Sequence, residues 1–478
     1  MIQSWQTTTP LYDHQQRAVE KLRAARVGGL FMEMGTGKTR AAIELAWLRR
    51  ERIDHVVWFC PVSLKETIRY EIEKHAPGAA VCVFDERTTS ANLPTACWYI
   101  IGIESMSSSD RVTLAVNTLI TEATMVVVDE SGYIKNHRAR RTERITLLAE
   151  RARYRLLLTG TPVSEGPVDL YSQMRFLSPL ILGYKSFWSF AANHLVYESG
   201  SGRIVRTLNA AHLAKRVQPY VYQVTKAECL DLPPKLHEGR YFTMTEQQYY
   251  AYGQAKEEIL FSLESDERIS ETVIYRLFGA LQQVVCGFWN RRDPMTDQVE
   301  PMSFPHRRIK ALLDVVRDVP ANEKMVIWSK YHFSIGQIVD ALRQEYGPGA
   351  TAEFHGRLSE QARHEELSRW RATTAGAPRF LIATQAAGGH GLTLNEAGHV
   401  VFYSNEFSYA KRLQAEDRCH RIGQTRPVTY VTLTCRHSID ERIASALERK
   451  ADAAAEFRRQ VHQMRDEKSI LKEIIRAL

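Results

Sequence analysis

The chain has 478 residues, of which 44% are hydrophobic and 25% are charged. These proportions are typical of a soluble globular protein, and the length predicts two to three domains, with two preferred. With 63 Lys and Arg against 55 Asp and Glu, the net charge is +8, which favours a polyanionic partner.

The seven cysteines are scattered, odd in number and form no C-x-x-C pair, so the sequence suggests neither a disulfide framework nor a zinc site. No apolar run approaches the roughly 18 residues of a membrane span. The segment Met1–Trp5 lacks the basic-then-apolar order of a signal peptide. We therefore expect no membrane association and a cytoplasmic protein, nucleoid-associated in a prokaryote or virus and nuclear in a eukaryote.

A candidate phosphate loop lies between an apolar run, Gly29–Met32, and a helix-patterned segment, Arg40–Trp47. Its glycines turn backbone amides towards an anion at a helix N-terminus, where Lys38 reaches the outer phosphates and Thr39 holds Mg²⁺. The first glycine of G-x-x-x-x-G-K-[ST] falls on Met32, so a purely structural turn is the alternative. The predicted ATP-binding residues of the loop are Gly35, Thr36, Gly37, Lys38 and Thr39.

Upstream of the loop, Gln15 lies on a helix-like segment that opens at Leu11. A glutamine amide has both the donor and the acceptor needed to read an adenine edge. Gln15 is therefore a candidate ATP-binding residue, and a solvated helix glutamine is the alternative.

Short apolar runs alternate with helix-like segments after the loop, which predicts a parallel sheet covered on both faces. In such a sheet, ligands bind beyond the carboxyl ends of the strands, so the residues after each run are candidates for chemistry. The runs are Val56–Phe59, Trp98–Ile101, Met125–Val128 and Arg155–Leu158.

The third of these runs is followed by Asp129 and Glu130. Asp129 can hold Mg²⁺ together with Thr39, and Glu130 can orient or deprotonate the attacking water in phosphoryl transfer. A helix N-cap is the alternative for this acid pair. The fourth run is followed by a polar turn that can couple the nucleotide to a neighbouring lobe, formed by Thr159, Gly160 and Thr161.

Taken in order, these motifs resemble the first lobe of a superfamily-two helicase. The segment Asp129–Asn136, D-E-S-G-Y-I-K-N, resembles the D-E-x-H-x-x-K-N signature of Snf/Swi-type ATPases, and Leu232–Lys235 resembles the L-P-P-K exit from their first lobe. Gly132 replaces the histidine of the signature. That histidine normally helps to couple the nucleotide to the second lobe, so coupling is carried by Gln414 or Thr159, or is weaker.

The second half begins with helix-like periodicity over 241–292, which resembles the helical brace of these ATPases, and a turn-rich segment at 293–298 reads as a loop. A second series of apolar runs then predicts a second parallel sheet without its own phosphate loop. The second lobe could therefore supply residues that complete the nucleotide site of the first lobe. The runs are Met325–Trp328, Thr351–Phe354, Phe380–Ala383, Val400–Tyr403 and Val428–Thr432.

On a helix, Gln414, Arg418 and Arg421 fall at i, i+4 and i+7 and share one face. Two guanidiniums that project together suit a developing phosphate charge, so we expect arginine fingers here, with Gln414 beside them. A solvated helix face is the alternative. The string from Gln414 to Gln424 matches the family pattern Q-x-x-D-R-x-x-R-x-G-Q.

Residues that follow the second-half strands are candidate contacts to a sugar-phosphate backbone, because glycines permit close approach and cations pair with phosphates. The segment Ala383–Thr393 resembles the DNA-tracking motif of the family, and ordinary loops are the alternative. The candidates are Lys330, His355, Arg357, Thr384, Gly388 and Gly389.

The final segment, 439–478, carries an apolar helical stripe among dense charge. We expect it to pack back on a lobe, with binding of a protein partner as the alternative.

The resemblance implies an α/β fold of two RecA-like domains, each a mainly parallel sheet flanked by helices, with helical bracing segments. The first lobe would span 1–235 and the second 236–478. The implied function is an ATP-dependent, Mg²⁺-using DNA translocase with helicase-like motifs, stimulated by duplex DNA and monomeric by default. The alternatives are a true helicase acting on forks, branched DNA or RNA, and an ATP-gated clamp that binds nucleic acid or blocks access to it without translocating.

Overall fold

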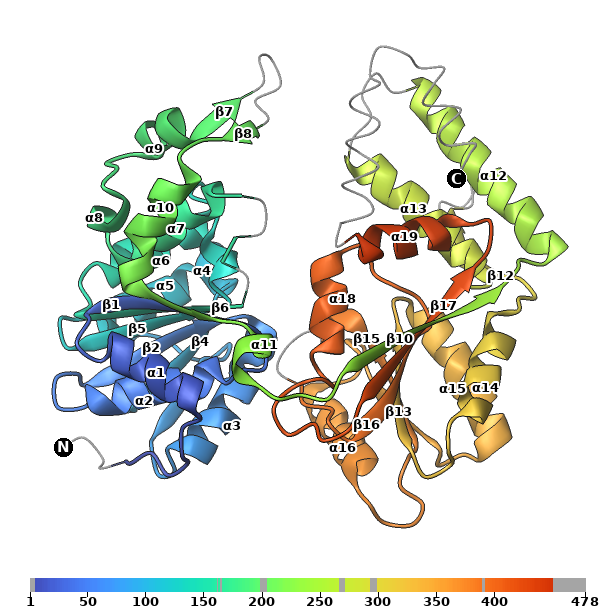
Figure 1. Cartoon of the computed structure of the whole chain (residues 1–478), viewed down its shortest axis with the longest axis horizontal. Coiled ribbons are helices and arrows are strands. Elements are labelled where there is room, and N and C mark those ends of the chain that lie inside the picture. Colours follow the sequence, from blue (N-terminus) through green and yellow to red (C-terminus); the bar gives the residue numbers. More distant parts are fainter. Residues whose placement is uncertain are drawn as a thin grey trace. The chain divides into compact units, whose positions relative to one another are not determined.

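The computed structural model describes residues 5–160, 162–163, 166–197, 204–265, 271–292, 299–388 and 392–449. The chain divides into two compact units, Met1–Asp231 and Leu232–Leu478 (Figure 1). The second unit thus begins four residues before the boundary expected after Lys235. We describe each unit by itself.

The described part of the first unit contains a seven-stranded, all-parallel sheet in the order β3-β4-β2-β5-β6-β1-β9. All five apolar runs of the first half form strands, whereas β3 and β9 were not expected. The strands are β1 (Val27–Met32), β2 (His55–Cys60), β3 (Val81–Val83), β4 (Trp98–Gly102), β5 (Thr124–Asp129), β6 (Tyr154–Thr159) and β9 (Val221–Val224). A separate antiparallel hairpin joins β7 (Leu195–Tyr197) to β8 (Ile204–Thr207).

Helices cover both faces of this sheet, as the pattern predicted. One core packs alternate strand residues such as Trp58 and Leu158 against α1 (Asp13–Leu22), α2 (Lys38–Leu48) and α3 (Lys65–His75). The opposite core packs Phe59 and Leu157 against the helices that follow β4, β5 and β6. Those helices are α4 (Ser105–Ser108), α5 (Asp110–Leu119), α6 (Arg140–Ala149) and α7 (Val168–Leu177).

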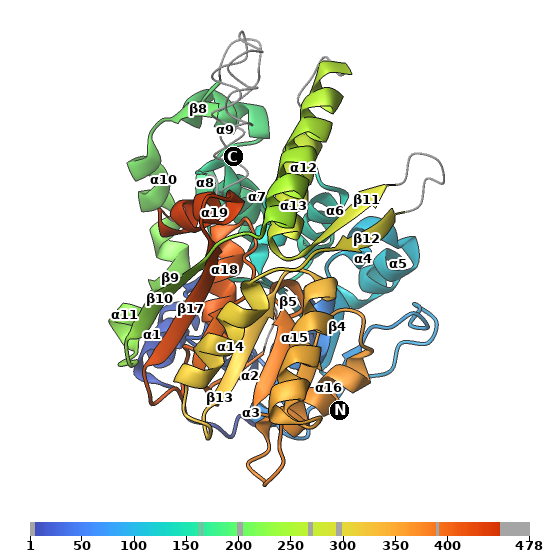
Figure 2. The same ribbon diagram turned by 90° about the vertical axis from the view of Figure 1, so that its right-hand side faces the viewer.

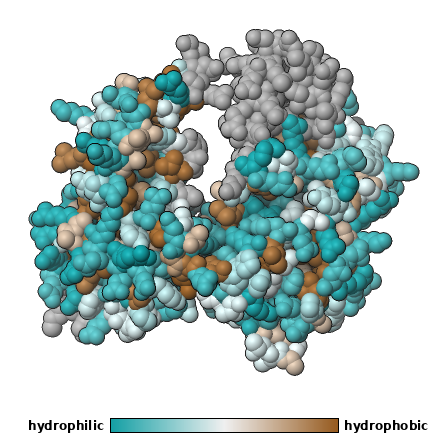
Figure 3. All heavy atoms as spheres, viewed as in Figure 1, coloured by the Kyte–Doolittle hydropathy of each residue, from teal (hydrophilic) through white to brown (hydrophobic). Residues whose placement is uncertain are grey.

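Four further short helices complete the first unit: α8 (Pro179–Leu182), α9 (Phe187–His194), α10 (Ala210–Val217) and α11 (Lys226–Cys229). Most of the coloured surface in Figure 3 is hydrophilic, and hydrophobic atoms reach the surface around α8, where 81% of Leu180 is exposed. No helix in the described part of the chain combines the length and the hydropathy needed to span a bilayer.

The second unit contains a six-stranded parallel sheet in the order β10-β17-β16-β13-β15-β14 within its described residues. All five apolar runs of the second half are strands of this sheet. The strands are β10 (Lys235–Phe242), β13 (Lys324–Ser329), β14 (Thr351–Phe354), β15 (Phe380–Thr384), β16 (Ala397–Phe402) and β17 (Val428–Cys435).

Both faces of the second sheet are covered as well. The helices α14 (Arg308–Asp318) and α15 (His332–Tyr346) pack on one face, as Figure 2 shows. Residues of α16 (Glu360–Arg371) and α18 (Tyr409–Glu416) pack on the other. Two further helices of this unit are the four-residue α17 (Gln385–Gly388) and α19 (Ile439–Glu448).

The expected helical brace at 241–292 is helical only in its middle. The helices α12 (Glu246–Ser265) and α13 (Glu271–Val285) form a hydrophobic cluster with α19. Before them, Tyr241 and Phe242 belong to β10, an edge strand whose largely exposed residues give no apolar run. After them, β11 (Phe288–Arg292) pairs with β12 (Val299–Ser303). The loop expected at 293–298 and the tail beyond residue 449 lie outside the described residues.

Candidate active site

The segment between β1 and α2 has the backbone of a phosphate loop. Gly35 and Gly37 both adopt left-handed conformations, with φ of 79° and 83°, which side chains other than glycine rarely accept. Gly37 is the N-cap of α2, and Lys38 is its first residue. The loop therefore places a helix N-terminus, with its unpaired amides and positive dipole end, at the carboxyl end of β1.

Two side chains of α1 hold this loop. Nε2 of His14 lies 2.7 Å from the carbonyl oxygen of Thr36, and Nε2 of Gln15 donates to the carbonyl oxygens of Thr36 and Gly37 at 3.2 and 3.4 Å. Both side chains are buried. The Gln15 amide thus faces the loop, and its expected reading of an adenine edge stays a prediction.

Lys38 stands beside the acid pair at the end of β5. Its Nζ donates to the carbonyl oxygen of Met32 at 2.9 Å, and its charge opposes the protonation of Asp129. Burial, reinforced by the charge of Glu130, raises the pKa of Asp129 to about 7. A buried carboxylate of this kind gains most from a cation, so the donor chemistry of Asp129 fits Mg²⁺ with further ligands from phosphates and water.

Glu130 has a left-handed backbone, with φ of 50° and ψ of 59°. It occupies the N-cap position of the short 3₁₀ turn Ser131–Ile134, yet its side chain makes no capping hydrogen bond. Its backbone amide instead donates to Oδ1 of Asp129 at 2.9 Å. The geometry therefore does not support the N-cap alternative for Glu130. A left-handed backbone at a residue other than glycine is strained, and such strain is typical of functional sites.

The polar turn after β6 lies between the phosphate loop and the acid pair. β6 pairs with β1 on one side and with β5 on the other, so that Thr159 is level with Phe31, and Leu158 with Asp129. A Cβ added to Gly160 would lie 3.2 Å from the backbone nitrogen of Met34 in the loop. Gly160 therefore lies against the loop and Thr159 lies beside the end of β1, whereas Thr161 lies outside the described residues. Their coupling role stays a prediction.

A buried glutamine that the sequence did not indicate connects two of these segments. Gln173 on α7 accepts a hydrogen bond from Oγ of Ser131 at 2.6 Å, and its Nε2 donates to the carbonyl oxygen of Pro162 at 2.7 Å. Gln173 thus fixes the residue after Glu130 relative to the turn after β6. The only available signal was a polar residue among the apolar positions of α7.

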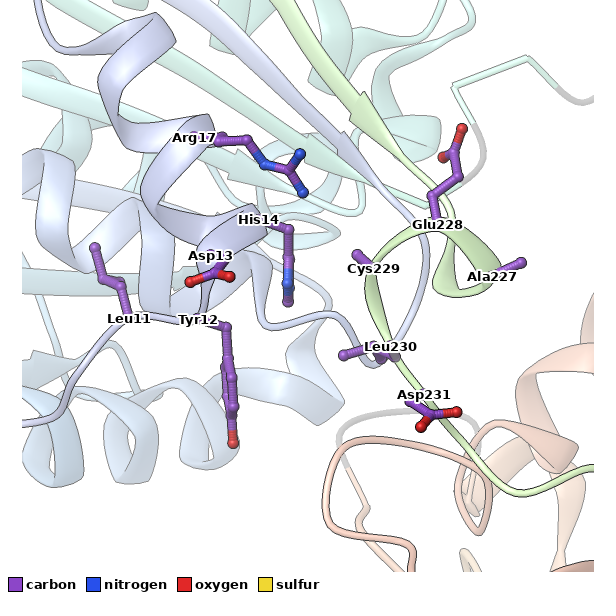
Figure 4. Close-up of a pocket in the computed structure, with 10 residues that line it drawn as sticks. All are labelled: Leu11, Tyr12, Asp13, His14, Arg17, Ala227, Glu228, Cys229, Leu230 and Asp231. Carbon is purple, nitrogen blue, oxygen red and sulfur yellow. The ribbon is translucent and has the colours of Figure 1, made fainter.

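A hollow of about 630 Å³ opens beside the start of α1. In Figure 4, Asp13, His14 and Arg17 face the turn of α11, which carries Glu228 and Cys229. His14 also contacts the phosphate loop through Thr36. The hollow therefore adjoins the loop, and its lining residues belong to the first unit alone.

In the second unit, the expected helix face does not form. The helix α18 ends at Glu416, so only Gln414 is helical, and Arg418 and Arg421 lie in the turn that follows. Arg418 is buried, and its carbonyl oxygen accepts a hydrogen bond from the amide of Leu394 at 2.8 Å. Arg421 is half-buried and donates to the carbonyl oxygen of Leu392 at 3.2 Å. A turn tied to the segment after β15, rather than one helix face, positions the two arginines.

An ionic cluster holds the start of that turn. Nζ of Lys235 lies 3.1 Å from Glu416 and 3.2 Å from Asp417, and Glu416 also pairs with Nε of Arg412 at 2.9 Å. These carboxylates are almost fully buried. β10 is therefore attached to the arginine turn through Lys235.

Three of the six expected DNA contacts are largely enclosed. Nζ of Lys330 lies 3.1 Å from the ring centre of Phe407, and burial lowers the pKa of Lys330 to about 8. His355 and Thr384 are buried, which leaves little surface for a phosphate. Gly388 ends α17, and Gly389 lies outside the described residues. Arg357 is the candidate that the structure exposes to solvent.

Comparison with known families gives two matches along the chain. The family model described as "SNF2-related domain" matches residues 14–287, which is more than half of the chain. The model described as "Helicase conserved C-terminal domain" matches residues 307–423. Together they cover the phosphate loop, the acid pair and the arginine turn.

Curated relatives include an "Uncharacterized ATP-dependent helicase" of Mycoplasma pneumoniae, 26% identical over 93% of this chain and 42% of that protein. The human "DNA annealing helicase and endonuclease ZRANB3" is 26% identical over 88% of this chain and 37% of that protein. The "Chromatin structure-remodeling complex subunit snf21" of Schizosaccharomyces pombe is 25% identical over 68% and 28%, respectively. The chain thus spans less than half the length of these relatives.

Among solved structures, the chain is similar to the "Sulfolobus solfataricus SWI2/SNF2 ATPase core in complex with dsDNA". That match has a TM-score of 0.44 and 21% identity, and it covers 93% of this chain and 92% of the other.

Proposed function

This chain belongs to the SNF2-related family of ATPases in helicase superfamily two, and from that premise we propose that it is a DNA translocase whose ATP hydrolysis is stimulated by duplex DNA. Helicase and remodelling names among its relatives support an ATP-driven action on DNA. We propose tracking along an intact duplex rather than strand separation, because the family resemblance implies tracking without processive unwinding.

The observation that carries the proposal is the meeting of three segments at one edge of the first sheet. The phosphate loop follows β1, the acid pair ends β5, and the polar turn ends β6 between them. Parallel sheets bind ligands at this edge. A purely structural turn does not explain why Asp129 is buried close to Lys38.

We assign roles to the residues of this edge. The amides of the loop and Lys38 would bind the phosphates of ATP, and the hollow beside α1 would receive the base. Thr39 and Asp129 would hold Mg²⁺, which neutralises phosphate charge when bound. Glu130 would orient the attacking water and accept its proton. Gln173, through Ser131, keeps Glu130 in register with the turn after β6.

The second unit would supply the remaining groups. Arg421 and Arg418, with Gln414, would stabilise the charge that develops on the transferred phosphoryl group. Since the loop and the arginine turn belong to different units, the open enzyme would be catalytically silent. Nucleotide-driven closure and reopening would then move the chain along DNA, with Arg357 among its phosphate contacts.

The alternative of a non-translocating clamp rests on Gly132, which replaces the family histidine. A Cβ added at Gly132 would meet nothing within 4 Å, so the backbone there leaves room for a side chain to begin. The retained Glu130, Arg418 and Arg421 favour turnover over clamping.

The test measures the rate of ATP hydrolysis with no nucleic acid, single-stranded DNA, duplex DNA and RNA, using Glu130→Gln as the control for contaminating activity. We expect duplex DNA to stimulate most, and the variant to bind ATP while losing hydrolysis, because it keeps the shape of Glu130 without the carboxylate. Equal or greater stimulation by RNA would overturn the substrate assignment. Hydrolysis by Glu130→Gln at the parent rate would overturn the assigned acid pair.

A further inference from the structure

A second hollow, of about 480 Å³, lies on the first unit among α6, α7 and α9. None of the residues assigned to ATP or DNA above lines it. Its lining combines apolar, cationic and hydroxyl side chains, among them Arg138, Thr142, Leu147, Ser172, Lys185 and Trp188.

The apolar part of the lining is unusually exposed. Trp188 is 68% exposed and Leu147 is 55% exposed, although both are large hydrophobic side chains. Phe187 is immobilised between two rings, because it stacks on His137 at a centroid distance of 3.7 Å and meets Tyr171 edge-on at 5.3 Å. A rigid aromatic base with an exposed tryptophan beside it is the composition of a protein-binding hot spot.

The rim of the hollow is cationic. Arg138, Arg175 and Lys185 line it and are exposed, against the single carboxylate of Glu143. The guanidinium of Arg138 lies 5.9 Å from the ring centre of Trp188. A ligand that places an apolar group on Trp188 would thus bring its neighbours next to positive charge, which favours acidic neighbours.

Two hydroxyl side chains of the lining are buried. Thr142 and Ser172 line the hollow, with 3% and 2% exposure, and neither Oγ1 of Thr142 nor Oγ of Ser172 has a hydrogen-bond partner among the described residues. Buried hydroxyls normally have a partner, and leaving one unpaired is costly. These two oxygens are enclosed by protein atoms, so they mark an uncompensated polar floor beneath the hollow.

We propose that this hollow is the docking site for an acidic segment of a partner protein, which inserts one large apolar side chain against Trp188 and Leu147. This goes beyond the proposed DNA motor, because it assigns a protein interaction to a surface that hydrolysis does not use. A sugar-phosphate backbone fits less well, since it offers no large apolar group to Trp188 and Leu147.

The test uses the full chain and a fluorescein-labelled peptide, Glu-Asp-Glu-Phe-Glu-Asp-Glu, followed by fluorescence anisotropy. We expect saturable binding that weakens with salt. Trp188→Ala should weaken it about tenfold or more, as expected for a central aromatic anchor. The charge reversal Lys185→Glu should weaken it as well. Both residues are exposed, so neither change should impair folding.

Three controls make the result decisive. Leu180→Ala removes an apolar side chain that is even more exposed than Trp188 and lies outside the hollow, and it should leave the affinity unchanged. A peptide with Ser in place of Phe should not bind. Absence of peptide binding, or equal binding by the parent and Trp188→Ala, would refute the proposal. Trp188-dependent binding of a single-stranded oligonucleotide that displaces the peptide would also refute it, in favour of a nucleic-acid site.

Discussion

At the scale of single residues, the phosphate loop depends on the missing side chain of Gly37. Its φ of 83° is unfavourable for an alanine, and a Cβ there would lie 2.0 Å from Nε2 of Gln15. The same close approach lets Gln15 bond to the loop. Gly37 therefore serves both the backbone turn and the contact with α1.

We predict that Gly37→Ala weakens ATP binding about tenfold or more, because the loop must leave its conformation or expel Gln15. Titration calorimetry with ATP and Mg²⁺ measures the effect. Gly336→Ala, at a position on α15 where a Cβ meets nothing within 4 Å, is the matched control. It should keep the parent affinity and stabilise the fold by about 0.5 kcal/mol. Parent-like affinity in Gly37→Ala would show that the loop does not bind the phosphates.

His306 gives a prediction about pH. Burial, together with the nearby charge of Arg308, lowers the pKa of His306 from 6.5 to about 4. The unfolded chain therefore takes up a proton at this residue between pH 6.5 and pH 4, where the folded chain resists it, so stability falls as the pH falls through this window. Above pH 6.5 the residue contributes no pH dependence.

The measurement is the urea midpoint of unfolding between pH 8 and pH 4 for the parent and His306→Gln. The variant should lose less stability on acidification, while carboxylates common to both proteins supply the remaining slope. Identical slopes for the two proteins would contradict the lowered pKa.

The local sequence placed candidate residues at the ends of strands but did not indicate how far each one is buried. Asp129, Glu130 and Thr159 were expected at one edge of the first sheet because each follows an apolar run, and the ends of parallel strands meet at one edge. Lys330 and His355 also follow strands, but their enclosure comes from distant contacts, such as Phe407 against Lys330. Phe407 is 77 positions away from Lys330, so the sequence around Lys330 does not indicate that this lysine is buried.

At the scale of elements, the same distinction applies to where helices end. The segment from Gln414 to Gln424 contains no proline, and its first glycine is Gly423. The sequence pattern therefore predicted a helix that continues past Glu416. The structure ends α18 there, where Lys235 from β10 pairs with both Glu416 and Asp417. The sequence did not predict β10, because its residues are mostly exposed and therefore form no apolar run.

We predict that Lys235→Met destabilises the fold by about 3 kcal/mol, because it removes the cation from two nearly buried carboxylates. Urea unfolding at neutral pH is the measurement. Arg240→Met removes a surface partner of Asp318, with both side chains about half exposed, and should cost less than about 1 kcal/mol. Equal effects of the two substitutions would show that the Lys235 cluster does not hold the arginine turn.

At the scale of the whole molecule, the sequence indicated two parallel sheets, and each unit has one with its own core on either face. The chemistry is divided between them. The phosphate loop and acid pair belong to the first unit, and Arg418 and Arg421 belong to the second. Under the proposed function, this division would make hydrolysis depend on residues of both units.

The decisive prediction therefore concerns Arg421. Arg421→Ala should retain most nucleotide contacts, which lie in the first unit, and should still bind DNA. Turnover should fall about 10³-fold or more, since that guanidinium is assigned to the charge of the transferred phosphoryl group. In a triplex-displacement assay on duplex DNA, the parent should strip the third strand only with hydrolysable ATP, and Arg421→Ala should not strip it. If the parent hydrolyses ATP without displacing the strand, while its DNA affinity switches with nucleotide, the chain is a clamp and the translocase proposal fails.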